Sequence, residues 1–255
     1  LGLHREDTPE GVVWCRQDRR EVPRPSHRIG DLRGVLGGDP APDLRWPDVL
    51  MLDTETTGLM GGTGTLAFLV GLGWWDDDGF QVRQLFLPEP GFEAPLLAAI
   101  EGQARGFRAV ATYNGASFDL PLLRTRARLS RRDDPVAALA GWDLLVGARR
   151  QWSRRLPDCR QQTVEEAICQ RPRRGGDIDG ALIPATYQHY LRTAELGDLE
   201  PVLRHNRRDI DGLALVLAAL AEGARRRGDG PGPATPWCDA WSQALICERR
   251  REVEL

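Results

Sequence analysis

The chain has 255 residues, of which 41% are hydrophobic and 28% charged, and its formal net charge is −3. This composition is typical of a soluble globular protein. We expect no membrane helix, because no apolar run approaches about 18 residues, and no signal peptide, because the first residues do not show a charged segment followed by an apolar core. We therefore expect a cytoplasmic protein without membrane contact. Five cysteines without a CxxC pair indicate reduced thiols rather than disulfides or a zinc site.

Arginine supplies all 34 basic residues. They gather in clusters within residues 124–132, 149–155, 171–174 and 204–208. An acidic total that contains several basic clusters suits a protein whose negative charge is partly concentrated in a site. The alternative is that the arginines only solvate helix faces.

Residues 1–45 are polar and rich in Pro, Arg and Gly, and only Gly11–Cys15 has the pattern of a strand. Residues 223–255 begin with a Gly/Pro-rich linker. We predict an N-terminal extension over 1–45, a main domain over 46–222 and a linker with a tail over 223–255.

The main domain opens with apolar strands and continues with alternating helices and strands. The predicted strands are Asp48–Asp53, Leu66–Trp75, Phe80–Leu87, Arg108–Tyr113 and a short one near Trp142–Leu145. The predicted helices are Phe92–Ala104, Leu120–Leu129, Leu145–Arg155, Gln162–Cys169, Ile183–Arg192 and Leu199–Glu222. This order indicates an α/β fold with a mixed five-stranded sheet flanked by helices.

Asp53 and Glu55 stand at the end of the first predicted strand, in the segment VLMLDTETTGL. Residues two positions apart on a strand share a face. Two carboxylates on one face repel each other unless a divalent cation or arginines neutralise them, and oxygen ligands suit Mg²⁺ or Mn²⁺. The alternative is that DTETTG is a solvated turn.

A third acid, Asp119, follows the fourth predicted strand in the segment YNGASFDLPLL, five residues after Asn114. Asp119 opens a predicted helix, where an N-cap role alone would explain it. The chain contains only two asparagines, Asn114 and Asn206, and each lies within five residues of an acid of this set. This placement suggests polar roles for both.

The long last helix carries a fourth acid, Asp209. His205 and Asp209 are four residues apart in the segment HNRRDIDGLALVL, so they share a helix face. Asp209 falls on or beside the apolar stripe, where a carboxylate needs a partner. Either the two side chains form a pair at the edge of the core, or they are ligands.

Taken together, the four acids come in the order expected of a two-metal phosphodiester site. Two ions roughly 4 Å apart need several carboxylates that converge from separate elements. A histidine placed four residues before the last acid can accept a proton from water.

Four segments of the chain resemble the DEDD 3′–5′ exonuclease superfamily of the ribonuclease H-like fold, and within it the bacterial YprB-type domain. They are LDTETTGLMGGTGTLAFLVGLG, VRQLFLPEPGFEAPLL, TYNGASFDLPLLRTR and LEPVLRHNRRDIDGLALVL. The resemblance extends roughly over Pro47–Glu222 and leaves out the N-terminal extension and the tail. It implies the ribonuclease H-like form of the mixed sheet.

The resemblance also implies roles for the site residues. Asp53 would bridge two metal ions, and Glu55, Asp119 and Asp209 would complete their ligands. His205 would be the general base. Here the chain departs from the family pattern: members with a catalytic histidine place it five residues before the last acid, whereas this chain has histidine at the four-residue spacing of the tyrosine-type members.

Further candidates for substrate contact are Thr54, Thr56, Asn114, Arg149 and Trp152. Trp152 lies among four arginines in the segment ARRQWSRR, which suits stacking of a base and pairing of phosphates. A helix with Trp152 in the core and the arginines in solvent fits equally well. Gly61–Thr65 is either a phosphate-cradling loop or a flexible connection, and Asp143 is either a supporting acid or a polar strand end.

We therefore expect a metal-dependent nuclease that uses two Mg²⁺ or Mn²⁺ ions, acting as a 3′–5′ exonuclease on single-stranded nucleic acid, DNA or RNA. The alternatives are a structure-selective endonuclease of the same fold and a non-catalytic nucleic-acid-binding module. A pure binding module gains little from clustered negative charge beside phosphates, so the set of acids disfavours it.

Overall fold

The structure is a computed structural model that describes residues 1–26, 29–32, 34–36, 41, 43–58, 64–172 and 175–228. Most of the predicted Gly61–Thr65 loop and the tail beyond residue 228 lie outside the described residues. In the part of the chain that is described, no helix combines the length and apolar character that a membrane span requires.

A seven-stranded sheet forms the centre of the molecule. Its strands are β1 (His4–Thr8), β2 (Gly11–Arg20), β3 (Val49–Thr56), β4 (Ala67–Asp76), β5 (Gly79–Phe86), β6 (Ala109–Thr112) and β7 (Ala140–Asp143). The spatial order is β1-β2-β5-β4-β3-β6-β7. The first five strands pair antiparallel, while β6 runs parallel to β3 and to β7. The mixed sheet is therefore confirmed.

The predicted count of five strands is too low, because residues 4–20 add two strands to one edge. The strand-like segment at Gly11–Cys15 continues to Arg20 and pairs with β5 over seven residue pairs. β1 has the sequence HREDT and lies at the open edge, where no apolar neighbour is required. A polar edge strand carries no periodic apolar signal, which explains why the sequence pattern did not indicate it.

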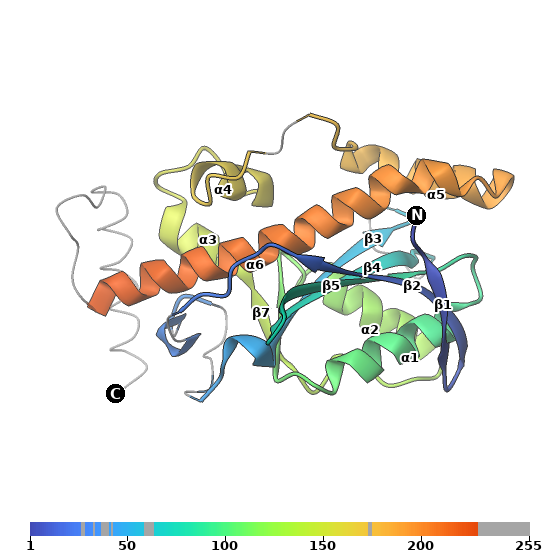
Figure 1. Ribbon diagram of the computed structural model, residues 1–255, viewed down its shortest axis with the longest axis horizontal. Coiled ribbons are helices and arrows are strands. Elements are labelled where there is room, and N and C mark those ends of the chain that lie inside the picture. The colour runs from blue at the N-terminus through green and yellow to red at the C-terminus, as the bar shows by residue number, and fades with distance from the viewer. Residues whose placement is uncertain are drawn as a thin grey trace.

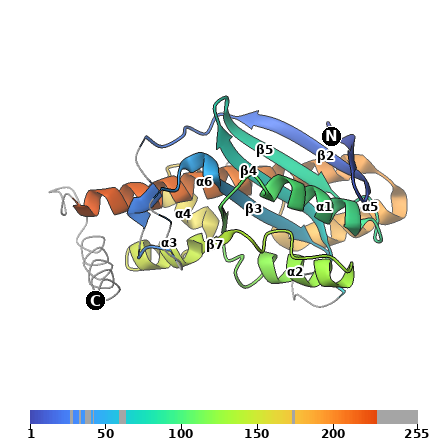
Figure 2. The same cartoon turned by 90° about the horizontal axis from the view of Figure 1, so that it is seen from below.

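Within the described residues, six α-helices surround the sheet: α1 (Glu93–Ala104), α2 (Asp119–Leu129), α3 (Leu144–Trp152), α4 (Gln161–Ala167), α5 (Ile183–Thr193) and α6 (Glu200–Gly228). Figures 1 and 2 show α1 and α2 on one face of the sheet and the long α6 across the other. Short 3₁₀ helices occupy Ile29–Leu32, Trp46–Asp48, Gly180–Leu182 and Leu196–Leu199. The predicted helices match the six observed ones to within a few residues, apart from a longer α6.

Glycines on β4 let α6 lie close to the sheet. A Cβ atom at Gly71 would stand 2.5 Å from Asn206 Oδ1 and 2.8 Å from Ile210 Cγ1, and one at Gly73 would collide with Ile210 and Phe80. Ile210 is completely buried at this contact. The close approach brings the polar side chains of α6 to the level of the acids on β3.

Candidate active site

The two acids of β3 lie inside the strand rather than after it. The predicted strand ended at Asp53, whereas β3 continues to Thr56 because its pairing with β4 persists, with a register shift only between Glu55 and Thr56. Asp53 stands opposite Gly71, and Glu55 stands opposite Leu69. Both carboxylates therefore project from the same face, the one that α6 covers.

Asn206 holds the Asp53 carboxylate from α6. The Asn206 Nδ2 atom donates to Asp53 Oδ2 at 2.8 Å, and its Oδ1 atom accepts from Gln84 Nε2 at 2.9 Å. Asp53, Gly71 and Gln84 form one row across three neighbouring strands, and Asn206 lies over the glycine between the two polar ends. Asn206 and Gln84 are buried, so this chain of hydrogen bonds fixes both amides and the carboxylate.

Glu55, His205 and Asp209 converge beside Asp53. One ligand atom from each of the three side chains lies within 4.8 Å of the others. His205 Nε2 is 3.2 Å from Asp209 Oδ2, while His205 Nδ1 is 3.0 Å from Asp177 Oδ1. The four-residue spacing on α6 thus places His205 and Asp209 together, and a fifth acid, Asp177, holds the far side of the ring.

Asp119 enters from the opposite face of the sheet, at the start of α2. Its Oδ1 atom accepts from the backbone N–H of Thr54 at 3.1 Å and from the Thr54 hydroxyl at 2.5 Å. Thr54 is the residue between Asp53 and Glu55, so these bonds tie Asp119 to the strand that carries the first two acids. The Thr54 hydroxyl, a predicted substrate contact, is used here to position a carboxylate.

Several carboxylates gather at this point. Burial raises the pKa of Asp53 well above its usual value, and the charges of Asp209, Glu55 and Asp119 raise it further, against the hydrogen bond from Asn206. Burial also raises the pKa of Asp119, against the hydrogen bonds from Thr54. Several converging carboxylates held by hydrogen bonds form a donor set that suits hard divalent cations such as Mg²⁺ and Mn²⁺.

The loop after β6 supports the α2 end of the site. Asn114 has a positive φ of 63°, and its N–H donates to Asp143 Oδ1 at 2.8 Å. A Cβ atom at Gly115 would collide with Thr112, so the turn requires glycine. Asp143 also caps α3 by accepting from the N–H of Leu145 at 3.0 Å. Asp143 is therefore a buried acid that braces the loop leading to Asp119.

The remaining predicted contacts lie outside this cluster. Thr56 donates its hydroxyl proton to the carbonyl of Gly58 at 2.8 Å. Arg149 is exposed on α3, and Trp152 is only 4% exposed in the core. The burial of Trp152 favours the alternative in which its ring packs inside. Three of the four arginines are exposed, whereas Arg150 is half-buried and donates to the backbone carbonyl of Leu36 at 2.6 Å.

Three polar residues of the cluster were not among the predicted site residues. Asn206 was noted only for its rarity, and Gln84 and Asp177 were missed. Gln84 is one of three polar residues in β5, so the strand pattern does not single it out. Asp177 lies in a loop without periodicity, 28 residues before His205. Of the three, only Asn206 carried a signal in the sequence.

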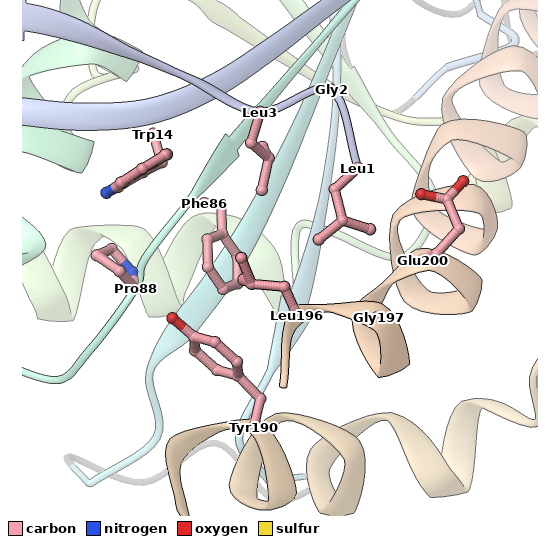
Figure 3. A pocket seen from close by; sticks show the side chains of 10 residues that line it. All are labelled: Leu1, Gly2, Leu3, Trp14, Phe86, Pro88, Tyr190, Leu196, Gly197 and Glu200. Atoms are coloured by element: carbon pink, nitrogen blue, oxygen red, sulfur yellow. The ribbon is translucent and has the colours of Figure 1, made fainter. Parts of the chain in front are cut away.

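An apolar pocket of about 650 Å³ opens on the face of the sheet that carries Asp53 and Glu55 (Figure 3). Its lining includes Leu3, Trp14, Phe86, Tyr190 and Leu196. The strand register places Glu55, Leu69, Phe86 and Trp14 in one row. Two strand spacings separate Glu55 from Phe86, or roughly 10 Å. The pocket therefore neighbours the acidic cluster.

The fold and the ordered acids define a member of the ribonuclease H-like class, and comparison with known proteins agrees. The sequence model of the RNase H superfamily matches residues 50–221, and the chain belongs to this superfamily.

The chain is similar in sequence to one known protein and in fold to another. It is 37% identical over 164 residues to the uncharacterized protein YprB of Bacillus subtilis (strain 168), an alignment that covers 64% of this chain and 39% of that protein. The chain thus spans well under half of its relative's length. The family B DNA polymerase of the archaeon Pyrobaculum calidifontis has a similar fold, with a TM-score of 0.56 and 16% identity over 81% of this chain and 28% of the polymerase. The predicted YprB-type, ribonuclease H-like character is confirmed.

Proposed function

We propose that the protein is a metal-dependent nuclease that removes nucleotides from the 3′ ends of single-stranded nucleic acid. The observation that carries this proposal is the convergence of Asp53, Glu55, His205 and Asp209 on one face of the sheet. The proposal rests on membership of the RNase H superfamily, whose fold is a nuclease fold, and on this donor set.

Asp53, Glu55, Asp119 and Asp209 are the residues that would hold divalent cations. When bound, such ions supply a Lewis acid for the phosphodiester and lower the pKa of water. Asn206 keeps one oxygen of Asp53 in a fixed direction, and Thr54 does the same for Asp119. The protein's contribution is therefore a carboxylate set whose orientation exists before any ion binds.

His205 would move the proton. Nδ1 of the ring faces Asp177 and Nε2 faces Asp209. With the Nδ1 proton donated to Asp177 and the Asp209 carboxylate engaged by a cation, Nε2 would carry a lone pair at the edge of the cluster. A nitrogen in this position can accept the proton of the attacking water while the phosphorus–oxygen bond to the leaving group breaks. Asp177 is then a positioning residue that selects the tautomer.

The apolar pocket supports the choice of a single strand. An unpaired base can leave its neighbours and place its ring against Trp14, Phe86 and Tyr190, whereas a paired base cannot. Glu200 lines the pocket and lies five residues before His205 on α6, a rise of about 7.5 Å. A base held there would keep its strand beside the acids.

The test uses end-labelled and circular substrates with Mg²⁺ or Mn²⁺. A 5′-labelled linear single strand should shorten progressively, and a circular single strand should resist. Asp53→Asn should abolish shortening, whereas the matched variant Asp7→Asn, at an exposed position on β1, should act like the parent. Cleavage of the circle would contradict the exonuclease proposal and favour a structure-selective endonuclease. Binding of nucleic acid without any cleavage would favour the non-catalytic binding module.

A further inference from the structure

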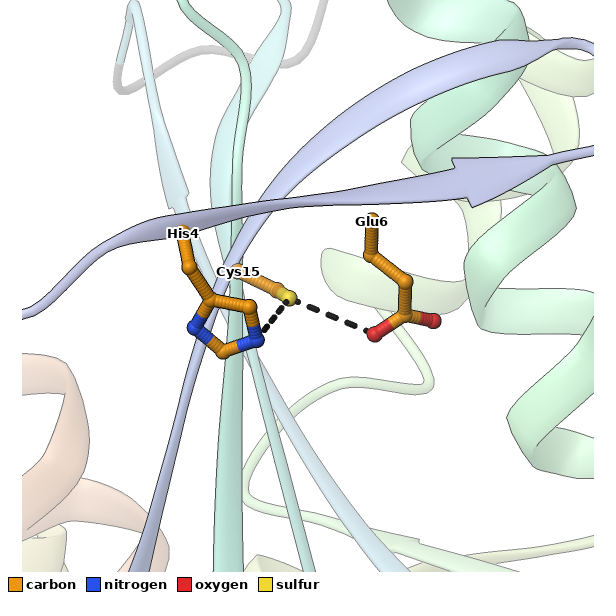
Figure 4. Close-up of side chains that lie close together, drawn as sticks. All are labelled: His4, Glu6 and Cys15. Carbon is orange, nitrogen blue, oxygen red and sulfur yellow. Dashed lines mark hydrogen bonds between the residues drawn. The ribbon is translucent and has the colours of Figure 1, made fainter.

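A second cluster of ligand-type side chains lies on the opposite face of the sheet, in the hairpin of β1 and β2. His4 and Glu6 are two residues apart on β1, so they share a face, and His4 pairs directly with Cys15 of β2. Figure 4 shows both β1 side chains directed at the Cys15 sulfur. Cys15 Sγ is 3.3 Å from His4 Nε2 and 3.4 Å from Glu6 Oε2.

These separations match those of a tetrahedral metal centre. With a Zn–S bond of about 2.3 Å and Zn–N and Zn–O bonds of about 2.0–2.1 Å, a tetrahedral angle sets the sulfur about 3.5 Å from each other ligand atom. One ligand atom from each of the three residues lies within 4.8 Å of the others. The three side chains therefore stand close to the spacing that a single ion requires.

The chemistry of this donor set differs from that of the carboxylate cluster. A thiolate, an imidazole and one carboxylate favour Zn²⁺, whereas an all-oxygen set favours Mg²⁺ or Mn²⁺. We propose that His4, Glu6 and Cys15 bind one Zn²⁺ ion that clips the edge strand β1 to β2. His4 is exposed and the Glu6 side chain is 43% exposed, so the fourth coordination position faces solvent.

The surroundings of the cluster support an ion. Arg83 NH2 donates to Glu6 Oε1 at 2.6 Å and Arg83 NH1 donates to Gln103 Oε1 at 3.0 Å, so Arg83 fixes one oxygen of Glu6 while the other oxygen faces the sulfur. Outer partners of this kind commonly orient carboxylate ligands.

Cysteine spacing along the chain gave no indication of this site, because the hairpin, not a CxxC segment, assembles it. The proposal is independent of the nuclease proposal. Its residues lie on the α1 side of the sheet, away from the face that carries Asp53 and Glu55, and it requires no catalysis.

Cobalt titration of the full reduced chain tests the site. We expect one equivalent of Co²⁺ to produce a sulfur-to-cobalt charge-transfer band, which equimolar Zn²⁺ then removes. Asp53→Asn should keep the band, because the carboxylate cluster contains no sulfur. Cys159→Ser and the double variant Cys238→Ser/Cys247→Ser should also keep it. Cys15→Ser should lose it.

His4→Gln guards against a folding artefact, because His4 is exposed and its replacement leaves the core unchanged. This variant should weaken Co²⁺ binding by at least about tenfold, measured by the same band. Absence of the band in the parent chain, or its persistence in Cys15→Ser, would overturn the zinc site.

Discussion

Asn206 on α6 donates a 2.8 Å hydrogen bond to the carboxylate of Asp53 on β3, across 153 residues of sequence. The bond exists because Gly71 leaves room for the amide over β4 and because Gln84 holds the other end of that amide. A helix, a glycine and two polar side chains thus determine where the central carboxylate points. The packing of α6 on the sheet therefore determines the geometry of the site.

Gly71→Ala should therefore damage stability and activity together. The new Cβ atom would stand 2.5 Å from Asn206 Oδ1, so the amide and α6 must shift. We expect a loss of about 1–3 kcal/mol in the free energy of unfolding, measured in urea, with a lower turnover number. Gly102→Ala on α1 is the matched control, because no atom lies within 4 Å of its new Cβ. It should gain up to about 1 kcal/mol, and an equal loss in both variants would contradict the packing argument.

Asp53→Asn should stabilise the protein in the absence of divalent cations. Burial and three neighbouring carboxylates raise the pKa of Asp53, so the folded state binds this proton more tightly than the unfolded state does. The resulting stability is complete below the ordinary aspartate pKa of about 3.9 and is lost as the pH rises through the raised value. Asparagine keeps an acceptor for Asn206 without the charge.

The measurement is urea unfolding in the presence of EDTA at mildly acidic and at neutral pH. The free energy of unfolding of Asp53→Asn should exceed that of the parent, and the difference should be largest at neutral pH. Added Mg²⁺ should narrow or reverse this difference by stabilising the parent. Asp43→Asn, at an exposed carboxylate whose pKa is lowered mainly by a hydrogen bond from Arg108, should show no such gain. Greater stability of the parent at every pH without cations would show that Asp53 is not under repulsion.

The sequence indicated the acids because each belongs to a local pattern. Asp53 and Glu55 end an apolar strand, Asp119 opens a helix, and Asp209 stands one turn after His205. These patterns depend on strand and helix periodicity, which short segments carry by themselves. The mixed sheet followed from the order of the elements for the same reason.

Features that depend on contacts between distant segments were not predictable in this way. Asp177 meets His205 only because a loop folds back over α6, and Gln84 meets Asn206 across 122 residues. β1 belongs to the sheet through hydrogen bonds to β2, although its side chains are polar. The position of Trp152 was undecided between core and surface until helix packing assigned one side of α3 to the interior.

His205→Ala should reduce turnover by about 10²–10⁴-fold, the range for loss of a positioned general base, while Mn²⁺ affinity falls much less. His205→Tyr separates two roles, because a tyrosine at this spacing can orient water. Activity in the tyrosine variant with little in the alanine variant would support orientation over proton transfer. An alanine variant with the parent's rate would remove His205 from the mechanism.

Asp177→Asn should lower kcat by about 10–100-fold and leave KM nearly unchanged, because it weakens the hold on His205 Nδ1 without touching the acids of β3. Asp177→Glu should recover part of the rate. The chain offers a matched pair for control: His189 Nε2 lies 3.4 Å from Asp198 Oδ2 on the surface. Asp198→Asn should keep the parent's kcat. An equal loss of kcat in Asp177→Asn and Asp198→Asn would show that the loss comes from the change in net charge and not from the contact of Asp177 with His205.

The apolar pocket gives the prediction that separates substrate binding from chemistry. Tyr190 lines the pocket, and its ring centroid lies 5.5 Å from that of Phe86. If a base occupies this space, Tyr190→Ala should raise KM for a single strand by about tenfold, the loss of one stacking contact, with kcat kept. Tyr190→Phe should bind like the parent, since the ring and not the hydroxyl supplies the stacking.

Phe92→Ala removes an aromatic ring that is 48% exposed and lies outside the pocket lining, so it should leave KM unchanged. A tenfold rise in KM for both alanine variants would point to non-specific loss of aromatic surface. An unchanged KM in Tyr190→Ala would remove the pocket from the path of the strand while leaving the acidic cluster as the catalytic centre.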